Sequence, residues 1–394
     1  MTDKLTRYLL FLIILASAVS TGILIYQIHI LRRLESLEQT ASGRIDTLHY
    51  IASRDEEYRV LRNIRPEKRE LLYPAAKTFL PSRDTLETFQ KRLRADLKEW
   101  IGIDETLLSC KIELRSLARE KIDSLGVVRE EVEFGFAGND LWVLHGYMIY
   151  PAKTGGPLPG IFCLNGHGGT ARAVAGLEED YSHGYGLALA AQGAKVLTFD
   201  WCFEGQSRLS DSQGREFKGH DSVFDYMAAT GRTGLALYLE NAYCAMKVLK
   251  SDPGVDQSRV AVTGISRGGE LTSYFAALFA PEIDAYYASG EGFPFVYRRF
   301  GGGCRCTFLP RIFDNYEYTD LLVAAAPLPG RVQIGFRDDI LGYWDYSEIL
   351  ISTIGDLYES LGIPEAFGLD LHPGKHEYDV QQGITFFKKH LLTR

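Results

Sequence analysis

The sequence predicts an α/β fold in which a mostly parallel central sheet carries helices on both faces. From residue 132 onward, short segments rich in Val, Ile, Phe and Tyr alternate with segments of helical periodicity. This alternation is typical of parallel strands joined by helical crossovers. Two further observations refine the prediction: Ser266 stands between glycines directly after one apolar segment, and a long uncharged segment, 8–28, lies near the N-terminus.

The uncharged segment 8–28 follows a short tail, residues 1–7, and as a helix it is long enough to cross the ~30 Å hydrocarbon core of a bilayer. Ala16-Ser17-Ala18 resembles a signal-peptidase site, but the apolar run continues past it to Leu31. We therefore expect an uncleaved signal anchor. Basic residues on the two flanks nearly balance, so the short tail alone favours a domain outside the cytoplasm.

Residues 29–63 predict a helical stalk or linker with rough heptad spacing of apolar residues. One interpretation is a short coiled coil that makes a homodimer, and the other is a solvated single helix. Residues 64–394 then form the globular domain, which begins with a helical extension over 64–130. Within this extension, an amphipathic helix is expected over 85–117.

The remaining elements follow from local pattern. Antiparallel-type strands are expected at 132–136 and 141–150. Buried strands are expected at 160–164, 195–199, 259–263, 283–289, 331–336 and 367–371. Helices are expected at 185–192, 235–249, 271–278, 344–361 and 380–392. The segment 256–259 is interpreted as a turn.

Composition excludes some classes of partner and cofactor. The net charge of −8 argues against a nucleic-acid surface. No C-x-x-C pair occurs among the six cysteines, and Cys163, Cys202 and Cys244 lie in or beside apolar segments. Cys304 and Cys306 are one residue apart in a glycine-rich loop, and we interpret them as structural thiols. We expect no metal and no cofactor.

The segment Gly264-Ile265-Ser266-Arg267-Gly268 has the G-x-S-x-G form of a nucleophile elbow. It follows an expected strand and precedes an expected helix, which is the context that this motif requires. The glycines leave room on a sharp turn where a Cβ atom would clash. A passive serine in a tight turn is the alternative, and the context favours a nucleophile.

A serine nucleophile needs a histidine base and a carboxylate that orients the histidine. The expected strand 331–336 is followed by Asp338, which we favour as the acid, and Asp339 is the second choice. The alternative is that the two aspartates only form a solvated acidic turn. After the last strand come His372 and His376. We favour His376 because it lies deeper in the loop, beside the start of the terminal helix.

The strand 160–164 runs into a glycine-rich turn, Asn165-Gly166-His167-Gly168-Gly169, where a backbone N–H could complete an oxyanion hole. Gly166 and Gly168 let the backbone approach a substrate. The backbone N–H groups of His167 and Arg267 are the expected donors. His167 as a metal ligand is a sharper alternative, but the sequence alone reveals no matching ligands.

Taken together, these motifs make the chain from about residue 132 resemble the α/β-hydrolase superfamily, and within it the acetyl xylan esterase and dienelactone hydrolase-like branch. The resemblance implies Ser266 as nucleophile, Asp338 as acid and His376 as base. It further implies a membrane-anchored serine hydrolase of carboxylic esters, with acetyl esters of carbohydrates as candidate substrates.

One departure from this branch leaves alternatives open. Arg267 directly follows the serine, as in glucuronoyl esterases, part of which take the acid from another strand. Glu291 would then replace Asp338, and Arg267 would donate to the oxyanion or hold a substrate carboxylate. The other rivals are a peptidase and a catalytically inactive binding module.

Overall fold

A computed structural model of the chain describes residues 83–393 except 140, 211–215, 218–219, 293–294, 296–303, 339 and 341–353. The chain divides into two compact units, Met1–Arg59 and Val60–Arg394, and every described residue belongs to the second. The expected anchor at 8–28 and the stalk at 29–63 lie outside the described residues. Among the helices that are described, none is both long and apolar enough to cross a membrane.

The second unit is built around a ten-stranded sheet in the order β1-β2-β3-β5-β4-β7-β8-β9-β10, with β6 paired to β3. The pairs from β5 through β4 to β10 are parallel, whereas β1, β2 and β3 pair antiparallel with one another and β3 with β5. The strands are β1 Ile112–Ile122, β2 Val127–Phe136, β3 Trp142–Pro151, β4 Leu158–Leu164, β5 Lys195–Phe199, β6 Arg208–Leu209, β7 Val255–Ile265, β8 Ala285–Ser289, β9 Gly330–Gly335 and β10 Phe367–His372.

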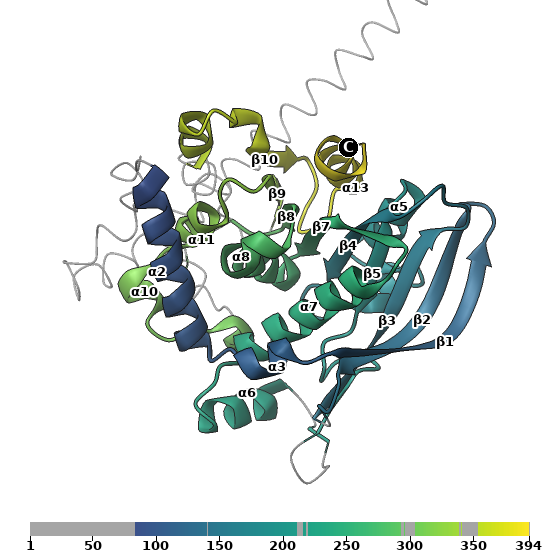
Figure 1. Ribbon diagram of the computed structural model, residues 1–394, viewed down its shortest axis with the longest axis horizontal. Helices are drawn as coiled ribbons and strands as arrows, with labels where there is room; N and C mark the ends of the chain where they lie inside the picture. Colours follow the sequence, from purple (N-terminus) through teal and green to yellow (C-terminus); the bar gives the residue numbers. More distant parts are fainter. Residues whose placement is uncertain are drawn as a thin grey trace, which may run out of the picture. The chain divides into compact units, whose positions relative to one another are not determined.

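Helices cover both faces of this sheet, and Figure 1 shows α2, α7 and α8 on one side and α5 and α13 on the other. The principal helices are α2 Arg83–Ile101, α3 Glu105–Ser109, α4 Ala171–Val174, α5 Tyr185–Ala191, α6 His220–Ala229, α7 Gly234–Ser251, α8 Arg267–Phe279, α10 Ile312–Asn315, α11 Tyr318–Ala325 and α13 Val380–Phe387. A π-helical turn, Lys388–Leu392, extends α13. The predicted α/β class is therefore confirmed.

The central strands are apolar on both faces because both faces are covered. In β4, Phe162 and Leu164 join the core beneath α7 and α8, whereas Ile161 and Cys163 join the core beneath α5 and α13. This two-sided burial explains the nearly continuous apolar runs in the sequence. The parallel pairing of β4, β7, β8, β9 and β10 places their carboxyl ends at the same edge of the sheet, where the candidate site lies.

Four expectations differ from the structure. The helix expected over 85–117 ends at Ile101, so the extension 64–130 is not helical throughout. Its C-terminal part forms β1 and the start of β2. Strand β1 is exposed along almost its whole length, so it lacks the apolar alternation that signals a strand. The expected turn 256–259 is an irregularity inside β7, where the register with β4 jumps from Asp256 to Val260.

The fourth difference concerns the helix expected over 344–361. Residues 354–360 are helical, and residues 341–353 lie outside the described part of the chain. The other expected strands and helices are all present, and their ends shift by a few residues at most. The shifts are largest where a strand or helix runs into a surface loop.

Candidate active site

Ser266 lies at a sharp turn between β7 and α8. Its backbone angles, φ 59° and ψ −123°, are those of a strained turn that few non-glycine residues adopt. A hydrogen bond from its backbone N–H to the Ser289 carbonyl oxygen, 2.8 Å long, holds the turn against β8. From Val260 to Phe279, all residues except Ser266 are buried, and Ser266 is partly exposed. The fold therefore presents this one side chain to the sheet edge.

The two glycines that flank the serine are required by close backbone packing. A Cβ atom on Gly264 would lie 2.4 Å from the Gly268 carbonyl oxygen. A Cβ atom on Gly268 would lie 2.0 Å from the Leu164 carbonyl oxygen. Since both contacts are with backbone rather than with flexible side chains, neither position tolerates a side chain without moving the turn.

His376 and Asp338 meet in the loops that follow β10 and β9. The imidazole Nδ1 and the Asp338 carboxylate Oδ2 are 2.6 Å apart, and both side chains are almost fully buried. The two loops are joined by a backbone hydrogen bond from the Arg337 N–H to the Gly374 carbonyl oxygen, 3.0 Å long. Because Nδ1 is bonded to Asp338, the other ring nitrogen of His376, Nε2, is left to face a reacting group. Nε2 is buried and has no hydrogen-bond partner among the described residues.

Gly290 is the point where the histidine and the serine come together. A Cβ atom built on Gly290 would lie 3.0 Å from the His376 Cε1 and 3.3 Å from the Ser266 backbone nitrogen. The imidazole therefore lies beside the elbow. The Ser266 hydroxyl does not hydrogen-bond to Nε2 in this structure. Such bonds are commonly long in enzymes without substrate and tighten when substrate binds.

The glycine-rich turn after β4 packs tightly next to the elbow. A Cβ atom on Gly166 would lie 2.2 Å from the Tyr181 hydroxyl oxygen and 2.9 Å from the Ile265 carbonyl oxygen, and Gly168 has a φ of +74°. The Tyr181 hydroxyl donates to the His167 carbonyl oxygen at 3.0 Å. Burial raises the pKa of Tyr181 to about 12, so the hydroxyl keeps its proton for this bond. The turn is thus held in one shape.

Of the two expected oxyanion donors, Arg267 is the first residue of α8, where a backbone N–H has no acceptor within its own helix. His167 lies exposed in the turn after β4. These positions match the place that the sequence predicts for the two donors.

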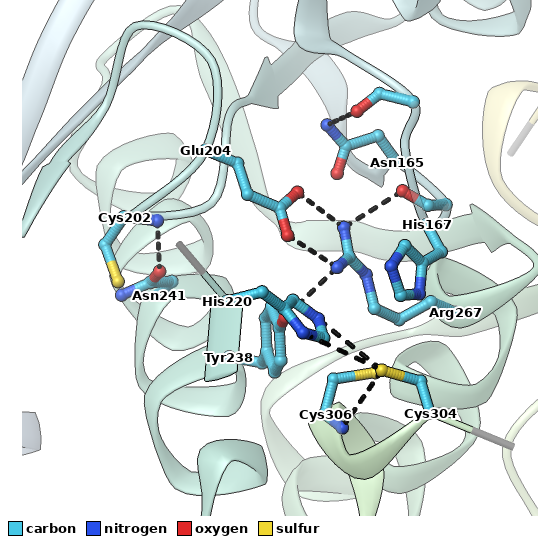
Figure 2. Close-up of polar contacts among 12 residues, drawn as sticks. Asn165, His167, Cys202, Glu204, His220, Tyr238, Asn241, Arg267, Cys304 and Cys306 are labelled. Atoms are coloured by element: carbon cyan, nitrogen blue, oxygen red, sulfur yellow. Dashed lines mark hydrogen bonds and ion pairs between the residues drawn. The ribbon is translucent and has the colours of Figure 1, made fainter. Parts of the chain in front are cut away.

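The Arg267 side chain does something other than expected. Its guanidinium forms a bidentate pair with Glu204, at 2.6 and 2.7 Å. It also donates to the Tyr238 hydroxyl and to the Gly166 carbonyl oxygen, both at 3.0 Å (Figure 2). Burial lowers the pKa of Arg267, but Tyr238 and Glu204 outweigh burial and raise it. All four Nη hydrogens are therefore engaged by protein groups, and only the buried Nε–H has no partner among the described residues.

The alternative site residues occupy different positions. Glu291 is 1% exposed and follows β8, but the imidazole of His376 bonds to Asp338 instead. His372 accepts a hydrogen bond from the Gly374 N–H at 3.2 Å, and burial lowers its pKa. This is a loop-stabilising role. Asp339 lies outside the described residues.

A second cluster of reactive side chains lies beside the glycine-rich turn. It consists of His167, His220, Cys304 and Cys306, whose nitrogen and sulfur atoms all lie within 4.8 Å of one another. Figure 2 shows the two imidazole rings next to the two cysteines, below the Arg267 guanidinium. The Cys304 sulfur is 3.5 Å from His220 Nε2. The pKa of Cys304 is lowered, mainly because the Cys306 thiol donates to it.

The sequence shows no ligand set that would match His167, and the structure places three candidate ligands beside it. The sequence separates these residues by as many as 139 positions, from 167 to 306, so spacing could not reveal the cluster. The available signal was the Cys304-x-Cys306 pair, which is a common form for two ligands of one ion, together with a histidine at the start of α6.

Comparisons with known proteins relate the chain to esterases and hydrolases. The family model for acetyl xylan esterases matches residues 117–299. A protein of Bacillus subtilis (strain 168) described as "Putative hydrolase YtaP" is 26% identical over 138 residues, which is 34% of this chain and 43% of that protein. The match thus spans less than half of that relative's length.

Solved structures share the fold. One is a "putative acetyl xylan esterase" from Bacteroides fragilis, with a TM-score of 0.60, 18% identity, and coverage of 74% of this chain and 76% of that one. Another is a glucuronoyl esterase from Solibacter usitatus, with a TM-score of 0.56, 15% identity, and coverage of 76% and 91%. The expected resemblance to the α/β-hydrolase superfamily and its acetyl xylan esterases is confirmed.

Proposed function

From a chain that has the α/β-hydrolase fold and matches the acetyl xylan esterase family over residues 117–299, we propose a serine hydrolase that removes acetyl groups from carbohydrate esters. The catalytic residues are Ser266, His376 and Asp338. The observation that carries this proposal is the buried His376–Asp338 pair lying against the Ser266 elbow. A passive serine turn would need no oriented, buried imidazole beside it.

In the proposed reaction, the Ser266 hydroxyl attacks the ester carbonyl while His376 Nε2 takes the hydroxyl proton. Asp338 accepts a hydrogen bond from Nδ1–H, which holds the imidazole in the tautomer that leaves Nε2 free to act as a base. The negative oxygen of the tetrahedral intermediate is stabilised by the backbone N–H groups of His167 and Arg267. His376 then protonates the leaving alcohol. Water repeats the sequence on the acyl-enzyme and releases acetate.

The Arg267–Glu204 ion pair stabilises the segments that surround Ser266. It links the elbow to the loop after β5 and, through the Gly166 carbonyl oxygen, to the glycine-rich turn. Arg267 is therefore a positioning residue in this proposal. It fixes the distance between the two segments that supply the oxyanion donors.

A panel of esters tests the proposed activity. We expect the wild-type chain to release acetate from acetylated xylo-oligosaccharides, and Ser266→Ala to lose this activity by at least about 10³-fold while keeping its melting temperature. Methyl glucuronate esters and a peptide complete the panel. Hydrolysis of the peptide alone would replace this proposal with a peptidase. No hydrolysis of any member, with wild type and variant alike, would favour a binding module.

Glucuronoyl ester hydrolysis is the second candidate, because Arg267 follows the nucleophile and a glucuronoyl esterase shares the fold. Against it, the Nη hydrogens of Arg267 are all engaged by protein groups. The same panel separates the two functions. Faster turnover of the methyl glucuronate ester than of the acetyl esters would favour the second candidate.

We also propose that residues 8–28 anchor the enzyme in a bilayer, with the hydrolase domain outside the cytoplasm. The support is the uncharged, apolar character of this segment and its length. Fractionation of cells that express the full chain tests the anchor. The protein should stay in the membrane pellet after a high-salt wash and be released by detergent, and release by salt alone would refute anchoring.

A further inference from the structure

We propose that His167, His220, Cys304 and Cys306 bind one zinc ion, which fastens the glycine-rich turn after β4 to α6 and to the loop at 304–307. The ligand set is two imidazole nitrogens and two thiolates, the set of many structural zinc sites. The proposal does not depend on the esterase activity, because it rests on the geometry and chemistry of these four side chains alone.

The geometry fits a tetrahedral ion. An ion bound at about 2.0–2.3 Å separates its four ligand atoms by about 3.3–3.8 Å. The Cys304 sulfur already lies 3.5 Å from His220 Nε2, and all four ligand atoms lie within 4.8 Å of one another. Small side-chain rotations therefore close the site. The Cys306 backbone N–H donates to the Cys304 sulfur at 3.4 Å, a contact that favours a thiolate at this position.

The four ligand side chains differ in how far they are exposed to solvent. Cys306 is 1% exposed, Cys304 and His220 are partly exposed, and His167 is exposed. An ion can therefore enter on the His167 side and exchange its water for sulfur and nitrogen ligands. Phe203 and Phe224 contact the His220 ring edge to face and supply apolar surroundings. Soft thiolates in such surroundings select zinc over magnesium or calcium.

The charge balance also favours a divalent ion such as zinc. The Arg267 guanidinium lies nearby and is already neutralised by Glu204 (Figure 2). Two thiolates cancel the two positive charges of the ion, so a Zn(Cys)₂(His)₂ centre adds no net charge beside the guanidinium. An ion with a larger uncompensated charge would be repelled there.

The ion would have a structural role rather than a catalytic one. Four protein ligands complete a tetrahedral site and leave no position for water or substrate. His167 binds through its side chain, so its backbone N–H stays free to donate to an oxyanion. The ion would thus hold His167 through its side chain, while the Tyr181 hydroxyl holds it through its carbonyl oxygen.

The test measures metal in the purified full chain and does not use activity. We expect about one zinc per chain by elemental analysis, and replacement by Co²⁺ should give a thiolate-to-metal charge-transfer band in the near ultraviolet. The double variant Cys304→Ser/Cys306→Ser should lose both the metal and the band. The matched control Cys110→Ser removes a free thiol that is not part of the cluster and should keep both.

Alkylation of the wild-type chain supplies a readout that does not depend on how the variant folds. Cys304, which is partly exposed, should resist iodoacetamide in the metal-bound protein and react after chelation, and added Zn²⁺ should restore its protection. The proposal is overturned if the folded wild-type chain takes up neither zinc nor cobalt, or if the double variant retains the metal. It is equally overturned if mass spectrometry finds Cys304 and Cys306 joined as a disulfide.

Discussion

At the scale of single residues, the partner of His376 decides which carboxylate the proposed mechanism uses. Sequence reasoning favoured Asp338 and kept Glu291 as an alternative. In the structure, His376 Nδ1 lies 2.6 Å from Asp338, and no hydrogen bond joins His376 to Glu291 among the described residues. A carboxylate bonded to Nδ1–H stabilises the imidazolium that forms during catalysis. Asp338 therefore has the geometry of the orienting acid.

The first prediction follows from this contact. Asp338→Asn should keep the fold but lower kcat by about 10³–10⁴-fold, because an amide can hold the imidazole in the wrong tautomer. Glu291→Gln is the matched control and should lower kcat by less than about tenfold. Steady-state kinetics on an acetyl ester, with melting curves of both variants, measures the effect. A larger loss for Glu291→Gln would reassign the acid.

A second residue-scale prediction concerns the buried ion pair behind the elbow. Glu204→Gln would leave the Arg267 guanidinium, 1% exposed, facing a neutral amide. Because Glu204 itself is partly exposed, we expect a loss of about 3 kcal/mol in the free energy of unfolding, the lower end for a broken buried pair. Urea denaturation measures this loss. Unchanged stability would mean that the pair contributes no net energy to the fold.

At the scale of elements, the turn between β7 and α8 depends on the absence of side chains at two positions. Gly268 packs directly against the Leu164 carbonyl of β4, and α8 is held in turn by α11 through a 2.7 Å hydrogen bond between Ser273 and Tyr318. The elbow is thus fixed on both sides. Changes in these contacts should affect stability as well as activity.

Gly268→Ala should destabilise the elbow severely, because its Cβ would lie 2.0 Å from a backbone oxygen that cannot rotate away. We expect a loss of about 3 kcal/mol or more and a matching fall in the melting temperature. Gly155→Ala is the control, since a Cβ there meets nothing within 4 Å. Equal melting temperatures for the two variants would refute the packing argument.

The N-terminus of α11 predicts a dependence of stability on pH. Glu317 caps this helix and accepts the backbone N–H of Tyr318 and of Phe295. Burial raises the pKa of Glu317 to about 8, from 4.5 when it is unshifted. The folded state thus holds a proton that the unfolded state releases above pH 4.5. The stability from this group is complete below about pH 4.5 and is lost as the pH rises to about 8.

Glu317→Gln should remove this dependence. Its amide oxygen still accepts the two N–H bonds and cannot ionise, so the variant should lose less stability than wild type between pH 5 and pH 8, by on the order of a few kcal/mol. Melting temperatures across this range measure the difference. Parallel curves for the two proteins would show that Glu317 does not carry the proton.

At the scale of the whole molecule, the sheet order explains why distant residues converge. Parallel strands β7, β9 and β10 end at the same edge, so the loops after them bring Ser266, Asp338 and His376 to one place. Figure 1 shows β7, β8, β9 and β10 one after another, so β8 lies between β7 and β9 and β10 ends the sheet. Only chain order and strand ends were needed to predict this convergence, and both can be identified in the sequence.

Other features could not be predicted because they depend on long-range packing. Strand β1 is recognisable only from its pairing with β2, since its own side chains are exposed. One alternative places the Arg267 guanidinium at the oxyanion or at a substrate carboxylate, but Glu204, from a loop 63 residues earlier, binds it in the structure. The His/Cys cluster likewise depends on where α6 and the loop at 304–307 lie.

Covalent labelling of the full chain by a fluorophosphonate tests the central claim most directly. The account predicts one adduct on the peptide that contains Ser266, formed rapidly in wild type and at least about 10²-fold more slowly in His376→Ala, because the imidazole base activates the hydroxyl. Mass spectrometry identifies the labelled residue. Folded wild-type protein with no adduct on Ser266, or equally fast labelling without the His376 imidazole, would contradict it.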